Sequence, residues 1–130
     1  GTTVRVVAGT TAAGTRGAVR NDYVEPTYLD VTLTPGARFE QAVDAKDSAF
    51  VYAIEGELKV GQTGNGLPPR TLAVLGPGDR VVAQAGDEIA RFLLVAAQPL
   101  GEPVARGGPF VMNTREEVLR AFDDYRNNRF

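Results

Sequence analysis

One stretch of the chain, residues 48–60, restricts the fold more than any other. Its sequence, SAFVYAIEGELKV, predicts a strand, a turn at Glu55-Gly56 and a returning strand. In the first strand the alternating residues are apolar or small on both faces, so we expect other parts of the protein to cover both. A strand that is covered on both faces indicates a closed barrel or a sandwich of two sheets.

Similar strand patterns recur along the chain between turns rich in Gly and Pro. Their ranges are 3–8, 27–34, 37–43, 70–75, 80–84 and 88–97. With residues 48–60 they amount to about eight short strands, which is typical of an all-β barrel or jelly roll. The stretch GQTGNGLPP after Val60 predicts an exposed loop. Arg91 interrupts the most apolar strand, and the sequence leaves open whether it is paired in the core or lies at an exposed edge.

The composition changes near the C-terminus. Residues 103–113 are rich in Pro and Gly, so we expect an extended segment. Thr114 and Glu117 have the spacing of a capping box, which predicts a helix over residues 114–127. The sequence therefore predicts one all-β domain, with a β-barrel over residues 1–102, the extended segment and a short C-terminal α-helix.

Composition excludes several classes of function. The chain has no His and no Cys, so it lacks the commonest general base and the commonest ligands of zinc, copper and non-haem iron. The net charge of −2 shows no basic excess, which argues against nucleic acid as a partner. No apolar run approaches a membrane span, and the start GTTVRVVAGT lacks the charged and apolar regions of a secretory signal. We therefore expect a cytoplasmic protein that has no cofactor and does not bind membranes.

Few polar residues form a pattern that indicates chemistry. Asp44, Asp47 and Asp79 do not have the spacing of a known calcium loop. Ser48 is the only serine, and without His it lacks a partner base. Arg16 and Arg20, in a predicted loop over residues 10–22, are candidates for ligand contact, although surface arginines are more often solvated.

The C-terminal segment resembles a known family. Residues 103–130, PVARGGPFVMNTREEVLRAFDDYRNNRF, are similar to the end of the pirins, and TYLDVTLTPGARFE and GPGDRV upstream resemble their C-terminal half. The resemblance covers residues 4–130 and implies a single cupin domain. Pirins are bicupins whose N-terminal barrel carries an iron-type metal site. Some members are associated with quercetin 2,3-dioxygenase activity and others with protein partners.

The cupin metal motif can be placed on this chain through Gly36 and Gly56, which match its two end glycines. Its ligand positions then fall on Ala42, Asp44, Ala49 and Val81. Only Asp44 has a side chain that can coordinate a metal. The resemblance therefore implies a cupin frame whose metal site is degenerate.

The same frame assigns the faces of the strands. The degenerate positions and Val51 are expected to point into the barrel, with Val51 lining a narrow apolar pocket. Phe50, Tyr52 and Ile54 are expected on the opposite face, as an interface that needs a cover. We expect that cover to be the tail, a neighbouring domain or a second copy of the chain.

Our first hypothesis is a metal-free, non-catalytic cupin domain with a structural or protein-interaction role, which alone is not an enzyme. Its expected partner is an N-terminal pirin-like cupin domain or another protein, and a standalone chain is expected to form a homodimer. One alternative is the support half of a quercetin 2,3-dioxygenase-like bicupin whose metal site lies in an N-terminal cupin. A second alternative is a small-molecule binding module that uses the apolar pocket.

Overall fold

The computed structural model describes residues 1–129. The chain divides into two compact units, the first from Gly1 to Pro99 and the second from Leu100 onward. Within residues 1–129 the structure contains no helix with the length and apolar character needed to cross a membrane.

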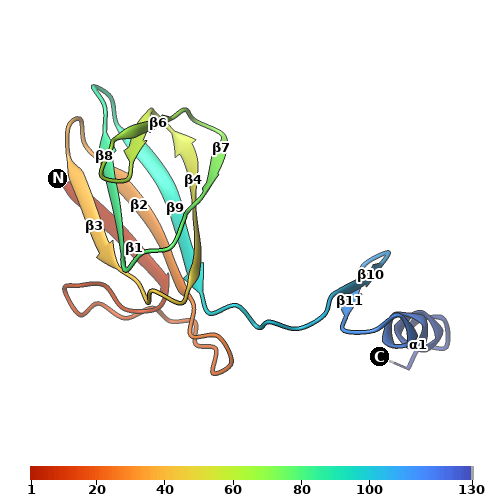
Figure 1. Cartoon of the computed structure of the whole chain (residues 1–130). Coiled ribbons are helices and arrows are strands. Elements are labelled where there is room, and N and C mark those ends of the chain that lie inside the picture. The colour runs from red at the N-terminus through yellow and green to blue at the C-terminus, as the bar shows by residue number, and fades with distance from the viewer. Residues whose placement is uncertain (130) are drawn as a thin grey trace. The chain divides into compact units, whose positions relative to one another are not determined.

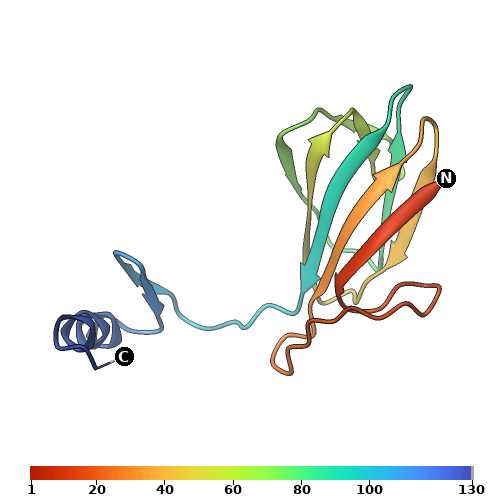
Figure 2. The same ribbon diagram turned by 180° about the vertical axis from the view of Figure 1, so that it is seen from behind.

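The first unit consists of two antiparallel β-sheets. The five-stranded sheet has the order β1 (Thr2–Ala8), β2 (Thr27–Leu33), β9 (Ala90–Ala97), β4 (Ser48–Glu55) and β7 (Thr71–Val74). The four-stranded sheet has the order β3 (Arg38–Ala42), β8 (Arg80–Ala85), β5 (Leu58–Val60) and β6 (Asn65–Leu67). Figure 1 shows the two sheets facing each other, and the view from behind in Figure 2 brings β1, β2 and β9 toward the viewer. The predicted all-β jelly roll is confirmed, as two facing sheets instead of one continuous cylinder.

The core lies between the two sheets and follows the alternation of the strands. Along β9 every second residue is buried, including Phe92 and Leu94, and on β4 the same holds for Val51 and Ala53. Phe39 of the four-stranded sheet meets Phe92 edge to face, with ring centroids 5.6 Å apart. This contact joins the two sheets at the centre of the core.

The predicted turn at Glu55-Gly56 is present, but the strand that follows does not return along β4. β5 pairs with β8 and β6, so the turn carries the chain from one sheet to the other. Gly56 has φ of +69°, and a Cβ there would overlap the carbonyl oxygen of Ile89. Only glycine fits this close crossing between the sheets.

One predicted loop contains a strand. Residues 61–69 were expected to form an exposed loop, but β6 occupies Asn65–Leu67 and pairs with β5. Leu67 is opposite Leu58, and both side chains are buried in the core. Burial of this one leucine anchors a Gly-rich segment whose local sequence disfavours a strand.

The second unit is a small hairpin and helix. Strands β10 (Ala105–Gly107) and β11 (Phe110–Met112) pair within the segment that was expected to be simply extended. The missing side chains at Gly107 and Gly108 make room for Phe122, since a Cβ on Gly108 would lie 2.9 Å from its ring. Phe110 packs edge to face on the same ring at a centroid distance of 5.0 Å. Contacts with the helix therefore stabilise the hairpin.

Helix α1 (Arg115–Arg126) begins at the predicted capping box. The Glu117 amide donates to the Thr114 hydroxyl at 3.2 Å, and the Glu117 carboxylate accepts from the Thr114 amide at 2.9 Å. The carboxylate also accepts from the Asn113 amide at 3.0 Å. Local sequence therefore determines where this helix begins.

Candidate functional site

A cavity of about 200 Å³ lies where β4 and β8 begin and β5 ends. It is lined by Val43, Asp47, Ala49, Val60, Gly61, Leu75, Gly76, Pro77, Gly78, Arg80, Val81 and Val82. Two of the degenerate ligand positions, Ala49 and Val81, are among these residues. Small apolar side chains therefore form much of the wall.

The other two positions do not point into the barrel as expected. Ala42 and Asp44 are both exposed. On β3 the buried residues are Phe39 and Gln41, so Ala42 lies on the outward face. The alignment through the two glycines was wrong by one residue on this strand. A shift of one residue moves every side chain of a strand to the other face of the sheet.

Val43 and Asp47 are among the residues of the cavity wall that sequence reasoning missed. The alternation of Ala37, Phe39 and Val43 in the segment ARFEQAV could have identified the inward face of β3. Val51 was expected to line the pocket, but it is fully buried in the core between the sheets. Ala49, two residues earlier on the same face of β4, lines the cavity instead.

Asp47 is the only carboxylate among the residues that line this cavity. Burial raises the pKa of Asp47 above its ordinary value, and the nearby charge of Asp44 adds to the effect. Residues 1–129 contain no group of three His, Cys, Asp or Glu side chains placed to hold a metal ion. One carboxylate among apolar groups does not match the ligands that an iron-type cupin site needs.

The outer face of the five-stranded sheet carries a second feature. Phe50 is opposite Val95 on β9 and Val74 on β7, and Tyr52 is opposite Leu93 and Leu72 on the same two strands. With Tyr28, which pairs with Val95, they form what we call the outer apolar patch: Tyr28, Phe50, Tyr52, Leu72, Val74, Leu93 and Val95. Leu72 is 51% exposed and Val74 79%. Four neighbouring strands, β2, β9, β4 and β7, thus contribute apolar side chains to the outer face of the sheet.

Ile54 was expected to belong to the same interface as Phe50 and Tyr52. The register between β4 and β9 shifts between Ala53 and Glu55, so Ile54 has no directly opposite residue on β9. It is half-buried and lies at this β-bulge, outside the cross-strand pairs that make up the patch.

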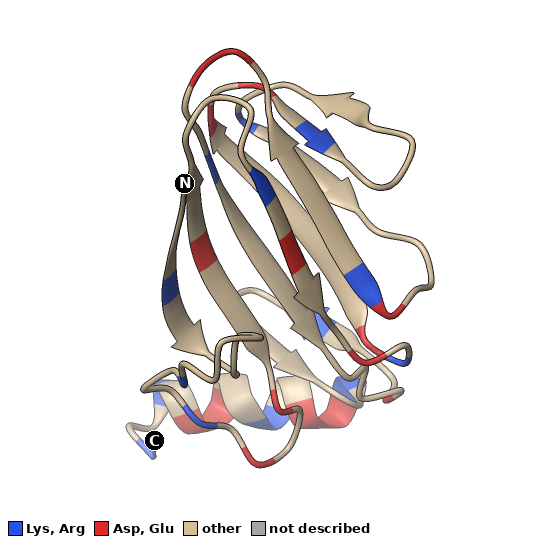
Figure 3. Cartoon of the chain, turned by 90° about the vertical axis from the view of Figure 1, so that its left-hand side faces the viewer, with Lys and Arg blue, Asp and Glu red and all other residues tan. Residues whose placement is uncertain are grey.

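An ion pair borders the outer apolar patch. Asp30 on β2 is opposite Leu93 and is held by Arg91 of β9. Arg91 therefore lies on the outer face and is paired, which answers the question that the sequence left open. Elsewhere in the first unit, positive and negative side chains are scattered over the strands and loops, as Figure 3 shows.

The chain resembles proteins of one family in sequence and in structure. The family described as the Pirin C-terminal cupin domain matches residues 28–130. A pirin-like protein of Caulobacter vibrioides is 40% identical over 130 residues, which are 100% of this chain and 46% of that protein. Pirin of Homo sapiens is 40% identical over 131 residues, which cover 98% of this chain and 44% of pirin.

The structural comparison agrees. A quercetin 2,3-dioxygenase from Acinetobacter baumannii superposes with a TM-score of 0.90 and 32% sequence identity, over 100% of this chain and 44% of that chain. The chain thus spans about half the length of the curated relatives that it matches.

Proposed function

Because the chain belongs to the family of pirin C-terminal cupin domains, we propose that it is a metal-free, non-catalytic cupin that supports a protein partner. The outer apolar patch is the observation that carries this proposal. Exposed apolar area on adjacent strands is typical of protein interaction sites.

An N-terminal cupin domain is the occupant that we assign to the patch. The relatives are about twice as long as the region they share with this chain, so they have room for another domain of similar size. In the isolated chain, we expect a second copy to cover the same surface. The cytoplasmic location stays a prediction.

The proposed absence of a metal rests on the side chains around the cavity between β4 and β8. Ala49 and Val81 have no donor atoms, and the single carboxylate of Asp47 supplies fewer ligands than iron or copper needs. We expect the chain to retain less than stoichiometric iron or copper after incubation with either ion and dialysis. One tightly retained equivalent per chain, measured by elemental analysis, would contradict the proposal.

The docking role is tested by sedimentation of the isolated chain. We expect self-association that is lost in a Leu72→Glu, Val74→Glu double variant, because two carboxylates would be buried in the contact. Val19→Glu is a matched control, since Val19 is 53% exposed but lies outside the patch. A chain that stays monomeric at high concentration, or a dimer that tolerates both charges, would count against this surface.

A second candidate is the support half of a quercetin 2,3-dioxygenase-like bicupin, which the likeness to the Acinetobacter enzyme favours. This reading expects no flavonol oxidation by the chain alone, and activity only when a metal-bearing N-terminal cupin is joined to it. Activity of the isolated chain would contradict both readings. A small-molecule binding module has less support, because the cavity of about 200 Å³ is smaller than common ligand pockets of about 300–1,000 Å³.

A further inference from the structure

A different cavity, of about 320 Å³, is formed by the long connection between β1 and β2. Its lining residues are Gly9, Thr10, Arg16, Gly17, Val19, Arg20, Asn21, Asp22, Glu25, Pro26 and Thr27. It shares no lining residue with the cavity between β4 and β8. A ligand bound here would therefore contact other residues than those around the cavity between β4 and β8.

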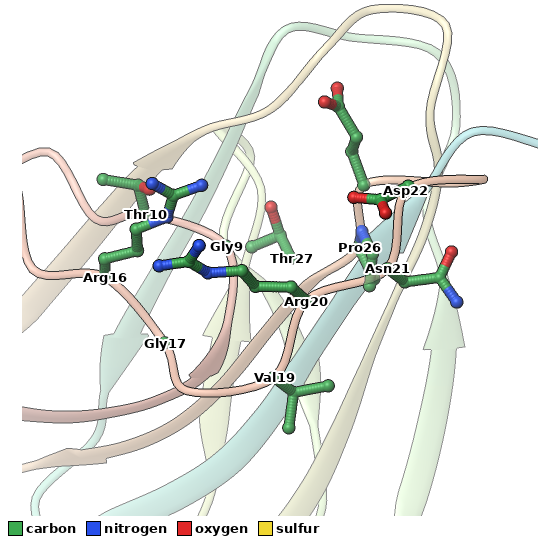
Figure 4. Close-up of a pocket in the computed structure, with 11 residues that line it drawn as sticks. Gly9, Thr10, Arg16, Gly17, Val19, Arg20, Asn21, Asp22, Pro26 and Thr27 are labelled. Carbon is green, nitrogen blue, oxygen red and sulfur yellow. The ribbon is translucent and has the colours of Figure 1, made fainter.

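Two arginines extend into this cavity from positions four residues apart. Figure 4 shows the guanidinium groups of Arg16 and Arg20 on the same side of the cavity, near Thr10, with Asp22 at the other end. The ion pairs within residues 1–129 involve other arginines, namely Arg38, Arg80, Arg91 and Arg129. Two like charges thus share one cavity without a carboxylate bound to either.

The backbone that carries these arginines is held firmly against β1. The Gly17 amide donates to the Gly9 carbonyl at 2.9 Å, and the Val19 amide donates to the Val7 carbonyl at 3.0 Å. Gly17 is buried, and a Cβ there would lie 2.5 Å from the Val7 oxygen. Residues 17–19 therefore lie tightly on the strand, and the two arginines flank this anchored segment.

The wall at Thr10, next to the two guanidinium groups, is also anchored from the core. Gln41 is the buried polar residue of the sandwich, with 5% of its surface exposed. Its side-chain amide donates to the Thr10 carbonyl at 3.3 Å and to the Ala42 carbonyl at 2.9 Å. A buried amide thus connects the wall at Thr10 to β3, so the cavity has fixed sides before any ligand arrives.

We propose that this cavity binds a small molecule through a phosphate or carboxylate group, held by Arg16 and Arg20. A guanidinium presents a planar fork of donors that matches the paired oxygens of such groups. The hydroxyls of Thr10 and Thr27 are further donors on the same lining. Asp22 and Glu25 would repel a second anionic group, so the ligand carries its negative charge at one end.

Isothermal titration of the whole chain with inorganic phosphate and, separately, with the monocarboxylate butyrate tests the proposal. We expect saturable binding of at least one probe, weakened about tenfold or more in Arg16→Gln and in Arg20→Gln. Binding of phosphate alone assigns a phosphorylated ligand, and binding of butyrate alone assigns a carboxylate. Added salt should weaken either interaction, because the arginines are accessible to solvent.

Three results would overturn the proposal. The first is no saturable binding of either probe. The second is an equal loss of affinity in Arg5→Gln, which removes one exposed charge of β1 outside the cavity. The third is full affinity in Arg16→Lys and Arg20→Lys, since lysine keeps the charge but not the fork. Thermal unfolding of every variant checks that it remains folded, and all substituted residues are exposed.

Discussion

Arg91 holds Asp30 across two neighbouring strands through two parallel contacts. Arg91 Nε lies 3.0 Å from Asp30 Oδ1, and Arg91 Nη2 lies 2.7 Å from Asp30 Oδ2. The Asp30 side chain is only 15% exposed, whereas that of Arg91 is 41% exposed. The hydrogen bonds from Arg91 lower the pKa of Asp30, in spite of the burial that acts in the other direction.

The pair should make stability depend on pH. Because the pKa of Asp30 is lower in the folded than in the unfolded chain, the stabilisation is present above about pH 4 and is lost as the pH falls through the folded pKa. We expect Asp30→Asn to lower the free energy of unfolding by about 1 kcal/mol at pH 7, with the exposure of Arg91 limiting the effect.

Urea unfolding at pH 7 and pH 3 measures this effect. The difference between Asp30→Asn and the original chain should shrink at the lower pH. Glu40→Gln is the control, since Glu40 forms its ion pairs with Arg38 and Arg80 on an exposed surface and should contribute less. An equal loss of unfolding free energy in both variants would show that the partial burial of Asp30 does not strengthen its ion pair.

Asp47 should respond to pH in the opposite sense. Its folded pKa is raised, so the ionised carboxylate opposes folding at pH 7, and this cost disappears as the pH falls through the folded pKa. We expect Asp47→Asn to leave stability at pH 7 unchanged or to increase it. Asp44→Ala should reduce it, because this change removes Asp44 Oδ1, which accepts from the Lys46 amide at 2.8 Å. Chemical unfolding compares the two, and a larger loss for Asp47→Asn would contradict the direction of its shift.

Alanine substitutions at Gly56 and Gly36 distinguish the cost of an unfavourable backbone conformation from the cost of a steric overlap. Both residues have positive φ, +69° and +70°, but only at Gly56 would a Cβ meet another part of the chain, at Ile89. We expect Gly36→Ala to cost about 1 kcal/mol through backbone conformation alone. Gly56→Ala should cost about 2 kcal/mol more, because the crossing between the sheets must shift. Similar values from denaturant unfolding would mean that the crossing adapts without strain.

Thr114 determines where α1 begins. Replacing it with Ala removes the acceptor of the Glu117 amide and should weaken the helix start by about 1 kcal/mol. Hydrogen exchange of the amides of residues 115–118 should accelerate, whereas amides in β9 should keep their protection. Thr114→Ser keeps the hydroxyl and should exchange like the original chain. Unchanged exchange in Thr114→Ala would mean that packing on the hairpin alone holds the helix.

The strands with regular alternation and the helix start could be predicted because their signals are local. On β4, the alternation that separates Phe50 and Tyr52 from Val51 and Ala53 follows from the pleat of a strand. Thr114 and Glu117 are three residues apart, so their mutual caps form within one turn. The metal positions were partly misplaced, because two glycines fix a spacing but not which face of β3 a residue occupies.

The sequence by itself determined the all-β class, the two apolar faces of β4, the helix boundary and the lack of His ligands. Only the tertiary structure decided that β5 joins the other sheet, that Asp47 reaches the cavity, and that Arg91 meets Asp30, 61 residues away. It also brought Arg16 and Arg20 into one cavity. Local patterns set which face a side chain occupies, whereas its partners depend on how distant strands pair, and that pairing is selected by burial of the whole core.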